Sequence, residues 1–387
     1  MDFIVFSDDW DRHPSSSEHL FRQLLNDNRV VWVNTIGARA PRLTVNDMKR
    51  SVEKLISWVP LKTHDTPGGG HSTDPNLTVI SPVILPYFGS RVVRKLNTFA
   101  VERKILNVVG DAARKDAVLF SSHPHVVDFF RAFPEFFKIY YCVDDYTLMP
   151  GTNKDLIKRL ESELIADCDL IFYTARYLES KFTGFENKIE YLPHGVDYSH
   201  FAARANADLR RRNTKPVIGF FGLLDEWVDT DMIYDIAYER TDWHIVLIGR
   251  AEVNLDKLLS LKNVERMNAV PYIELPSYAN RFDVGIIPFR INELTKAVNP
   301  VKFLEYMAMG IPVVSTSLPE LHRFGSEVYF GDTSGQFIAR IEQALKEDSS
   351  ERRDRRKQIA AANSWTNQSR KLTESIRARQ KVLASDR

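Results

Sequence analysis

Lys302 and Glu305 stand three residues apart, so a helix would present both side chains on one face. An ammonium group suits a phosphate, and a carboxylate suits a pair of hydroxyl groups such as those of a ribose. The same spacing occurs in ordinary surface pairs on helices. The pair by itself is therefore compatible with a binding site and with a plain capped helix.

The stretch Asn299–Val314 around this pair predicts a loop, a helix, a turn and a strand. Asn299 suits an N-cap, and Pro300 suits the first helical position. Gly310 can end the helix in the left-handed conformation, and Val313 begins an apolar run typical of a buried strand.

A second apolar run at residues 283–289 predicts another buried strand upstream. The loop that follows it lies beyond a strand's carboxyl end and leads into a helix N-terminus. Open α/β sheets bind phosphorylated ligands at that place. We therefore expect Asn292, Thr295 and Asn299 to lie beside such a ligand.

Two other segments carry polar or glycine residues at predicted strand ends. Gly219-Phe-Phe-Gly222 would let the backbone approach a phosphate, although a plain tight turn has the same pattern. Asp144 and Asp145 follow an apolar run, where a carboxylate acts either as a general base or as a turn and capping residue. We favour Asp145 as the base because it lies nearer the loop.

The polar loop at residues 7–19 follows the first predicted strand and suits the acceptor side of a cleft. His13 and His19 are candidates for positioning an acceptor or for serving as an alternative base.

These segments require a scaffold of parallel strands. Apolar strand-like runs alternate with helix-like runs nearly throughout, which is typical of an α/β fold with helical crossovers. A fresh series of strands begins after a polar stretch near residue 200. The sequence thus predicts two doubly wound, Rossmann-like domains, at residues 1–200 and 201–365. Strands are predicted at residues 3–7, 30–34, 118–122, 139–143, 170–174, 189–192, 217–221, 245–248, 264–267, 284–288 and 313–315, and helices at 16–26, 91–109, 153–166 and 175–182.

The composition narrows the class of protein. A chain of 387 residues with 44% hydrophobic residues can bury the cores of two or three domains. A net charge of +1 creates no overall electrostatic field that would attract nucleic acid. Cys142 and Cys168 are expected as buried thiols, and no cysteine or histidine cluster has metal-ligand spacing. No signal-peptide or membrane-spanning pattern is visible, which predicts a cytoplasmic protein.

Aromatic and basic residues alternate at positions 87–95 and recur as Arg103 and Lys104. A helix with this composition can rest on the anionic inner face of a membrane. A solvated basic face over a core stripe is the alternative.

Three motifs together resemble GT-B glycosyltransferases of group 1, the family 4-like type. They are His194–Asp197, the Gly219–Gly222 turn, and Pro-x-Lys-x-x-Glu-Tyr-x-Ala-x-Gly-x-Pro-Val-Val at Pro300–Val314. The chain looks most similar to bacterial enzymes of exopolysaccharide and teichuronic acid synthesis and to the xanthan glucuronosyltransferase.

This resemblance implies a nucleotide-sugar donor, for which uridine is the expected base, bound by the second domain. Lys302 would hold the diphosphate and Glu305 the ribose, while Gly222, Asn292, Thr295 and Asn299 would lie near the phosphates or the sugar. Asp145 would be the base in the first domain, which binds the saccharide or lipid-linked acceptor. The helix at residues 366–387 would cross back to the first domain, and no redox cofactor or metal would be required.

The sequence departs from the family pattern at two places. Ala297 stands where retaining members carry the first of two glutamates, and Glu226, Trp227 and Asp229 occupy the region of the usual Arg and Lys. These departures favour an inverting displacement driven by Asp145 without deciding the outcome. A nucleotide-sugar epimerase and a non-catalytic nucleotide-sugar-binding protein are the alternatives.

Overall fold

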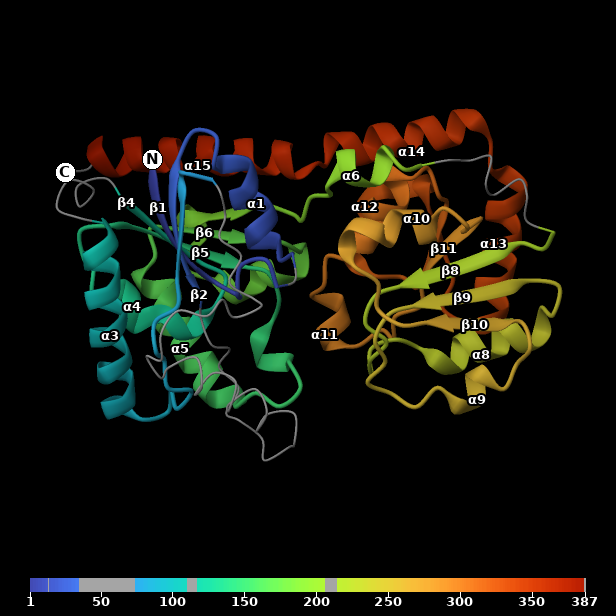
Figure 1. Cartoon of the computed structure of the whole chain (residues 1–387), viewed down its shortest axis with the longest axis horizontal. Coiled ribbons are helices and arrows are strands. Elements are labelled where there is room, and N and C mark those ends of the chain that lie inside the picture. Colours follow the sequence, from blue (N-terminus) through green and yellow to red (C-terminus); the bar gives the residue numbers. More distant parts are fainter. Residues whose placement is uncertain (13, 35–73, 110–116, 206–213, 386–387) are drawn as a thin grey trace, which may run out of the picture. The chain divides into compact units, whose positions relative to one another are not determined.

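The computed structural model describes residues 1–12, 14–34, 74–109, 117–205 and 214–385 (Figure 1). These residues form two compact units. The first comprises residues 1–174, 178–192 and 369–387, and the second comprises residues 175–177 and 193–368. The C-terminal segment from Ser369 onwards therefore belongs to the first unit.

The first unit is built on a seven-stranded sheet in the order β3-β2-β1-β4-β5-β6-β7, in which all paired neighbours run parallel. The direction of strand succession reverses between β1 and β4. The strands are β1 (Asp2–Ser7), β2 (Arg29–Asn34), β3 (Leu77–Ile80), β4 (Ala117–Ser121), β5 (Phe137–Cys142), β6 (Leu170–Tyr173) and β7 (Ile189–Tyr191).

The second unit is built on a six-stranded parallel sheet in the order β10-β9-β8-β11-β12-β13. Here the reversal falls between β8 and β11. The strands are β8 (Val217–Phe221), β9 (His244–Ile248), β10 (Val264–Met267), β11 (Val284–Ile287), β12 (Val313–Ser315) and β13 (Val328–Phe330).

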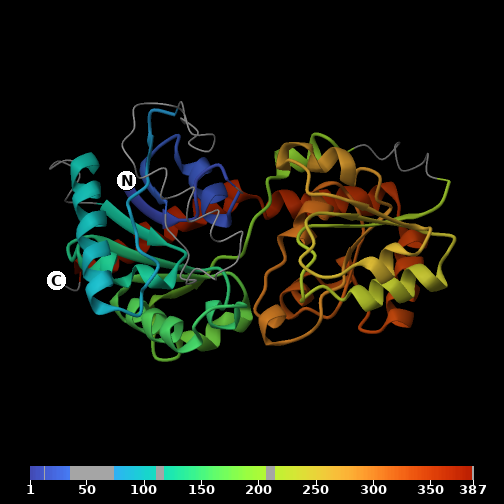
Figure 2. The same cartoon turned by 60° about the horizontal axis from the view of Figure 1, so that its bottom comes forward.

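Helices cover both faces of each sheet (Figures 1 and 2). In the first unit, α4 packs between α3 and α5, whereas α1 and α15 lie on the opposite side of the sheet. In the second unit, α12 packs against α6 and α14, whereas α8 packs against α13. The α-helices are α1 (Ser16–Leu24), α3 (Arg91–Val109), α4 (Val127–Arg131), α5 (Lys154–Asp167), α6 (Tyr198–Ala202), α8 (Thr230–Glu239), α9 (Asp256–Leu259), α10 (Leu275–Ala279), α11 (Glu293–Lys296), α12 (Val301–Ala308), α13 (Ser334–Glu347), α14 (Ser350–Ala362) and α15 (Trp365–Ser385).

Short 3-10 helices complete the connections between these elements. They are η2 (Pro124–Val126), η3 (Tyr146–Leu148), η4 (Arg176–Phe182), η5 (Glu186–Lys188), η6 (Tyr272–Glu274) and η7 (Pro319–Glu327).

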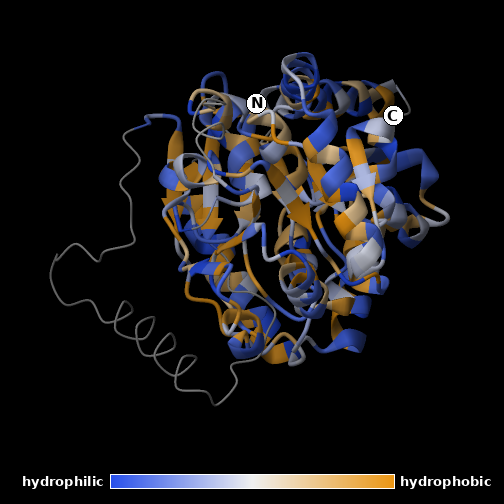
Figure 3. Ribbon diagram, turned by 90° about the vertical axis from the view of Figure 1, so that its right-hand side faces the viewer, coloured by the Kyte–Doolittle hydropathy of each residue, from blue (hydrophilic) through white to orange (hydrophobic). Residues whose placement is uncertain are grey.

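Apolar residues concentrate on the strands, while the outer faces of the helices are polar (Figure 3). Strands β1, β4 and β8 are buried almost from end to end, as expected for parallel strands covered on both faces. Cys142 and Cys168 are free, buried thiols, as predicted. Within the described ranges, no helix is long and apolar enough to cross a membrane.

Several predicted elements differ from the observed ones. Strands β3 and β13 were not predicted, and the predicted helix at residues 175–182 is the 3-10 helix η4. Both missed strands are short and lie at a sheet edge, where few apolar residues mark a strand. The α-helix predicted at residues 91–109 is confirmed as α3.

Candidate functional site

The second sheet reverses its strand order between β8 and β11, and the loops after these two strands hold the predicted donor residues. Gly222 directly follows β8, and the segment from Pro288 to Pro300 connects β11 to α12. Ligands in open α/β sheets bind at such a reversal, beyond the carboxyl ends of the strands. The fold therefore assembles these residues at the expected edge.

Gly222 and Lys302 are in direct contact. The backbone of Gly222 has φ +128°, and a Cβ atom at this position would lie 2.2 Å from Lys302 Cε and 2.6 Å from Lys302 Nζ. A side chain here would therefore both strain the backbone and displace the lysine. Gly249 supports the same turn from β9, because its own Cβ would meet the carbonyl oxygen of Gly222 at 1.9 Å.

The ammonium group of Lys302 has no hydrogen bond or ion pair with any described residue. It lies 5.6 Å from the ring centre of Phe220 and 5.9 Å from that of Phe289. Burial lowers the pKa of Lys302, and the nearby Glu305 carboxylate opposes that shift. A half-buried cation with only weak ring contacts is well suited to meet an anion.

The carboxylate of Glu305 also accepts no hydrogen bond within the described part of the chain. Burial raises the pKa of Glu305 to about 7, Lys302 acts in the opposite direction, and Asp197 adds to the increase. Asp197 caps α6, where its carboxylate accepts hydrogen bonds from Ser199 and from the backbone of His200. The carboxylate of Glu305 is thus not engaged by the described residues, whereas Asp197 has a structural role as the cap of α6.

Asn292, Thr295 and Asn299 lie in the segment between β11 and α12, and their placement beside a ligand stays a prediction. Asn292 and Thr295 form a reciprocal capping box at the start of α11, and Thr295 Oγ1 also donates to the carbonyl of Arg290. The prediction that Asn299 caps α12 is wrong: Pro300 takes the N-cap position, without a side-chain cap. Asn299 is nevertheless buried in this loop.

The loop after β8 carries acidic residues where the family pattern has basic ones. Arg290 pairs with Asp229 at the end of this loop and with Asp231 in the first turn of α8, and its guanidinium lies 3.1 Å from each carboxylate. Arg290 follows β11, so the cation comes from the neighbouring strand rather than from the loop itself. Asp225 accepts a hydrogen bond from the backbone of Glu226.

The first sheet reverses between β1 and β4, and a cluster of polar side chains follows these strands. Asp8 follows β1, and its carboxylate oxygen lies 3.4 Å from His123 Nε2 beyond β4. The ring of His123 stacks on His125 and meets Tyr146 edge-on. The contact with the His123 imidazole lowers the pKa of Asp8, although burial opposes it.

Sequence reasoning missed His123 and His125, and it included Asp8 only as a member of the polar loop at residues 7–19. The signal was present, because both histidines follow the apolar run predicted as a strand at residues 118–122. Of the histidines that were chosen instead, His13 lies outside the described residues, and His19 is half-buried in the first turn of α1.

The two carboxylates after β5 differ sharply. Asp145 accepts hydrogen bonds from Thr147 N at 3.0 Å, Thr147 Oγ1 at 2.6 Å and Lys181 Nζ at 2.8 Å. Although burial opposes the shift, these donors lower the pKa of Asp145. Lys181 also pairs with Glu161 at 2.9 Å, so Asp145 belongs to a fixed ionic network.

Asp144 has no hydrogen bond to its carboxylate from any described residue. Burial, with a further contribution from the charge of Asp145, raises the pKa of Asp144 to about 7. Asp145 is engaged because it caps η3, whereas Asp144 lies in the bend before that cap. In the described ranges, no group of acidic, histidine and cysteine side chains could hold a metal ion.

Comparison with known proteins shows what the chain resembles. The sequence model for glycosyl transferases group 1 matches residues 215–347, which contain Gly222, Lys302 and Glu305. The group 1 match ends within α13, so it covers the second sheet and leaves the first unit outside.

A Bacillus subtilis protein, TuaH, described as a glycosyltransferase of teichuronic acid biosynthesis, is 29% identical over 234 residues. That match covers 56% of this chain and 59% of TuaH, so the chain spans less than two thirds of this relative.

Solved structures match the whole chain. HepE of Anabaena, in complex with UDP and glucose, has a TM-score of 0.66 at 13% identity and covers 98% of this chain and 100% of its own. Sucrose-phosphate synthase from Thermosynechococcus elongatus has a TM-score of 0.69 at 12% identity and covers 100% of both chains. At such identities the likeness concerns the fold, which is GT-B, with two Rossmann-like sheets.

Proposed function

We propose that this protein is a glycosyltransferase that moves a sugar from a nucleoside diphosphate sugar to a hydroxyl acceptor. The single observation that carries the proposal is the free ammonium group of Lys302, which lies across Gly222 at the strand reversal of a group 1 domain. The nearby Glu305 gives the same site a carboxylate for a ribose.

The nucleotide is proposed to be UDP. HepE, which has the same fold, was solved with UDP and glucose. Lys302 would contact the diphosphate and Glu305 the ribose hydroxyls, while the backbone at Gly222 would approach the phosphates. Asn292 and Thr295 would act indirectly, by holding the loop before α12, and Asn299 would support it from a buried position.

Transfer requires a base for the acceptor hydroxyl. We propose an inverting displacement in which the acceptor oxygen forms a bond to the anomeric carbon. The bond from that carbon to the diphosphate breaks, the electron pair leaves with the diphosphate, and the acceptor proton passes to a carboxylate. Asp145 was the predicted base, but its hydrogen bonds to Thr147 and Lys181 favour Asp144 for this role.

The positive charge needed by the departing diphosphate would come from Lys302 and from the N-terminus of α12. We therefore propose that no metal or redox cofactor is required. The acceptor is proposed to be a saccharide or lipid-linked precursor of a surface polysaccharide, consistent with the description of TuaH. A cytoplasmic location at the membrane's inner face accords with this acceptor.

Calorimetric titration with UDP and GDP tests the donor site. Replacing Lys302 with alanine should weaken UDP binding by roughly tenfold to a hundredfold, because a hydrogen bond to a charged group contributes about 1.5–3 kcal/mol. Lys346→Ala, on the exposed face of α13, is the matched control and should bind normally. A chelator should leave UDP binding unchanged. Equal affinities of wild type and Lys302→Ala would remove the lysine from the site.

Product analysis separates the alternatives. An epimerase would convert the sugar of the donor without an acceptor, and a non-catalytic binding protein would bind UDP without releasing it from any UDP-sugar. Release of UDP that increases with an added acceptor supports the transferase.

A further inference from the structure

Helix α3 carries an exposed apolar stripe. Val92, Leu96 and Phe99 are 69%, 56% and 63% exposed, and their spacing places them on one face of the helix. A row of large apolar side chains on the surface of a helix indicates a site of contact with a protein or a membrane.

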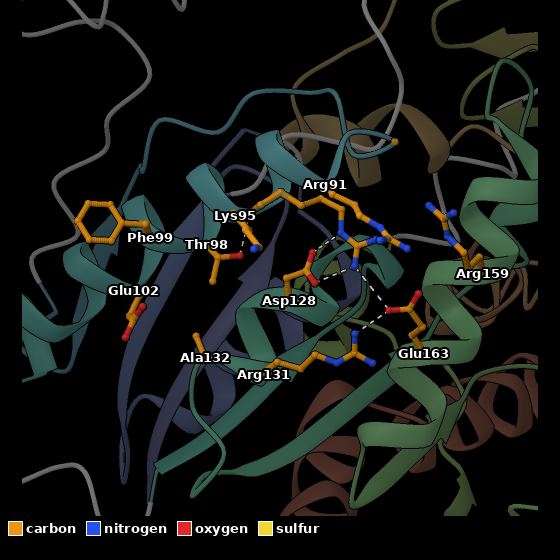
Figure 4. A pocket seen from close by; sticks show the side chains of 12 residues that line it. Arg91, Lys95, Thr98, Phe99, Glu102, Asp128, Arg131, Ala132, Arg159 and Glu163 are labelled. Atoms are coloured by element: carbon orange, nitrogen blue, oxygen red, sulfur yellow. Dashed lines mark hydrogen bonds and ion pairs between the residues drawn. The ribbon is translucent and has the colours of Figure 1, made fainter.

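A cationic cavity of about 660 Å³ adjoins this stripe (Figure 4). It is lined from α3, α4 and α5, and Phe99 belongs both to its wall and to the stripe. Five basic and three acidic side chains line it, so the lining carries a net positive charge. The basic ones are Arg91, Arg94, Lys95, Arg131 and Arg159, and the acidic ones are Glu102, Asp128 and Glu163.

Two of these five cations are already neutralised. Arg94 pairs with Asp128 and lies 3.5 Å from Glu163, and Arg131 contacts Glu163 at 2.7 Å. These ion pairs link α3, α4 and α5 around the cavity.

The other three cations are Arg91, Lys95 and Arg159. They are exposed and make no hydrogen bond or ion pair with the described residues. In Figure 4, Arg91 and Lys95 extend from α3, and Arg159 approaches from α5 on the other side of Asp128 and Glu163. Free cations gathered around a cavity attract a multiply charged anion.

We propose that this cavity binds the phosphate group of a membrane lipid while the α3 stripe enters the lipid surface. The charges select an anion, and the stripe requires that the anion be attached to an apolar tail. Helices with basic residues beside an apolar face bind anionic bilayers in this manner. The inference deepens the proposed function, because it rests on a lipid-linked or membrane-bound acceptor.

Vesicle sedimentation with the full chain tests this proposal. Vesicles of phosphatidylcholine with phosphatidylglycerol should bind the protein, and vesicles of phosphatidylcholine alone should not. The variant Arg91→Gln/Lys95→Gln/Arg159→Gln should lower the partition coefficient on the order of a hundredfold, since each basic residue near an anionic surface adds about a factor of five. High salt should weaken wild-type binding as well.

Two further variants control for charge and for the stripe. Lys371→Gln/Arg377→Gln/Lys381→Gln removes the same number of exposed charges from α15 and should bind vesicles normally. Leu96→Ser/Phe99→Ser keeps every charge and should lose vesicle binding. The proposal is overturned if the α15 variant loses as much binding as the cavity variant, or if the stripe variant binds fully.

The same variants also distinguish other occupants of the cavity and of the stripe. Tight binding of inorganic phosphate without vesicle binding would make the cavity a site for a free anion and overturn the lipid proposal. So would a stripe variant that changes only the oligomeric state, since the stripe would then contact a second copy. UDP titration of the same variants should be unchanged. If the wild-type protein does not bind UDP, the donor site is refuted, but the vesicle result still tests the lipid proposal.

Discussion

The choice of base between Asp144 and Asp145 gives the most discriminating prediction. Asp144 has a pKa raised to about 7 by burial and by the charge of Asp145. The pKa of Asp145 is below its ordinary value because Lys181 and Thr147 donate to it, although burial opposes them. Only the ionised form of a carboxylate can accept the acceptor's proton, so the two candidates predict different pH profiles.

If Asp144 is the base, the rate should increase through neutral pH. A group with this pKa is about 10% ionised at about pH 6 and about 90% ionised at about pH 8, so the rate should increase about ninefold between them. If Asp145 is the base, the rate should be flat over the same interval. The assay is UDP release from a UDP-sugar with water as acceptor, which does not require the natural acceptor.

The variants sharpen this comparison. Asp144→Asn should reduce UDP release by about a hundredfold or more while UDP affinity stays unchanged. Asp145→Asn removes a neighbouring negative charge, so the increase in rate should persist but move to lower pH. A flat wild-type profile, together with an inactive but stable Asp145→Asn, would refute the assignment of Asp144.

Other substitutions address single contacts. Gly222→Ala should weaken UDP binding at least tenfold because its Cβ would displace Lys302, whereas Gly325→Ala, also at positive φ but with nothing within 4 Å, should affect only stability. Lys181→Met should lower the free energy of unfolding in urea by about 3 kcal/mol, because it leaves the carboxylates of Asp145 and Glu161 without their cation. Lys158→Met, at an exposed position, should leave the free energy of unfolding unchanged. Burial raises the pKa of Glu305, so the folded state holds this proton more tightly than the unfolded chain, and wild type should lose stability as pH rises from 4.5 to about 7. The Glu305→Gln variant cannot titrate at this position. The difference between its unfolding midpoint and that of wild type should therefore increase over that pH interval, and a constant difference would contradict a raised pKa of Glu305.

Much of the scaffold was predictable because parallel strands buried on both faces leave continuous apolar runs. The runs at residues 217–221 and 313–315 coincide with β8 and β12. The left-handed Gly310 was predictable too, since its φ of +70° is the conformation in which glycine ends a helix.

The polar side chains were less predictable, because their roles depend on partners distant in the sequence. Nothing near Asp145 shows that Lys181 will reach it from η4, yet this contact, together with the hydrogen bonds from Thr147, distinguishes Asp145 from Asp144. The pairing of Asp8 with His123 likewise joins residues more than a hundred positions apart. Local patterns identify the edge of the sheet on which residues gather, but not which of them are already paired.

The discontinuous first unit has a consequence for how the chain matures during synthesis. Helix α15 contributes buried Leu372 and Ile376 to that unit, and its Arg379 donates to the carbonyl of Asp169. The ribosome must therefore produce residues 193–368 before these contacts can form, which takes roughly 10–35 s at typical elongation speeds. Until then the nascent sheet exposes an apolar face that a chaperone can bind, whereas the second unit is nearly contiguous and can fold as it emerges.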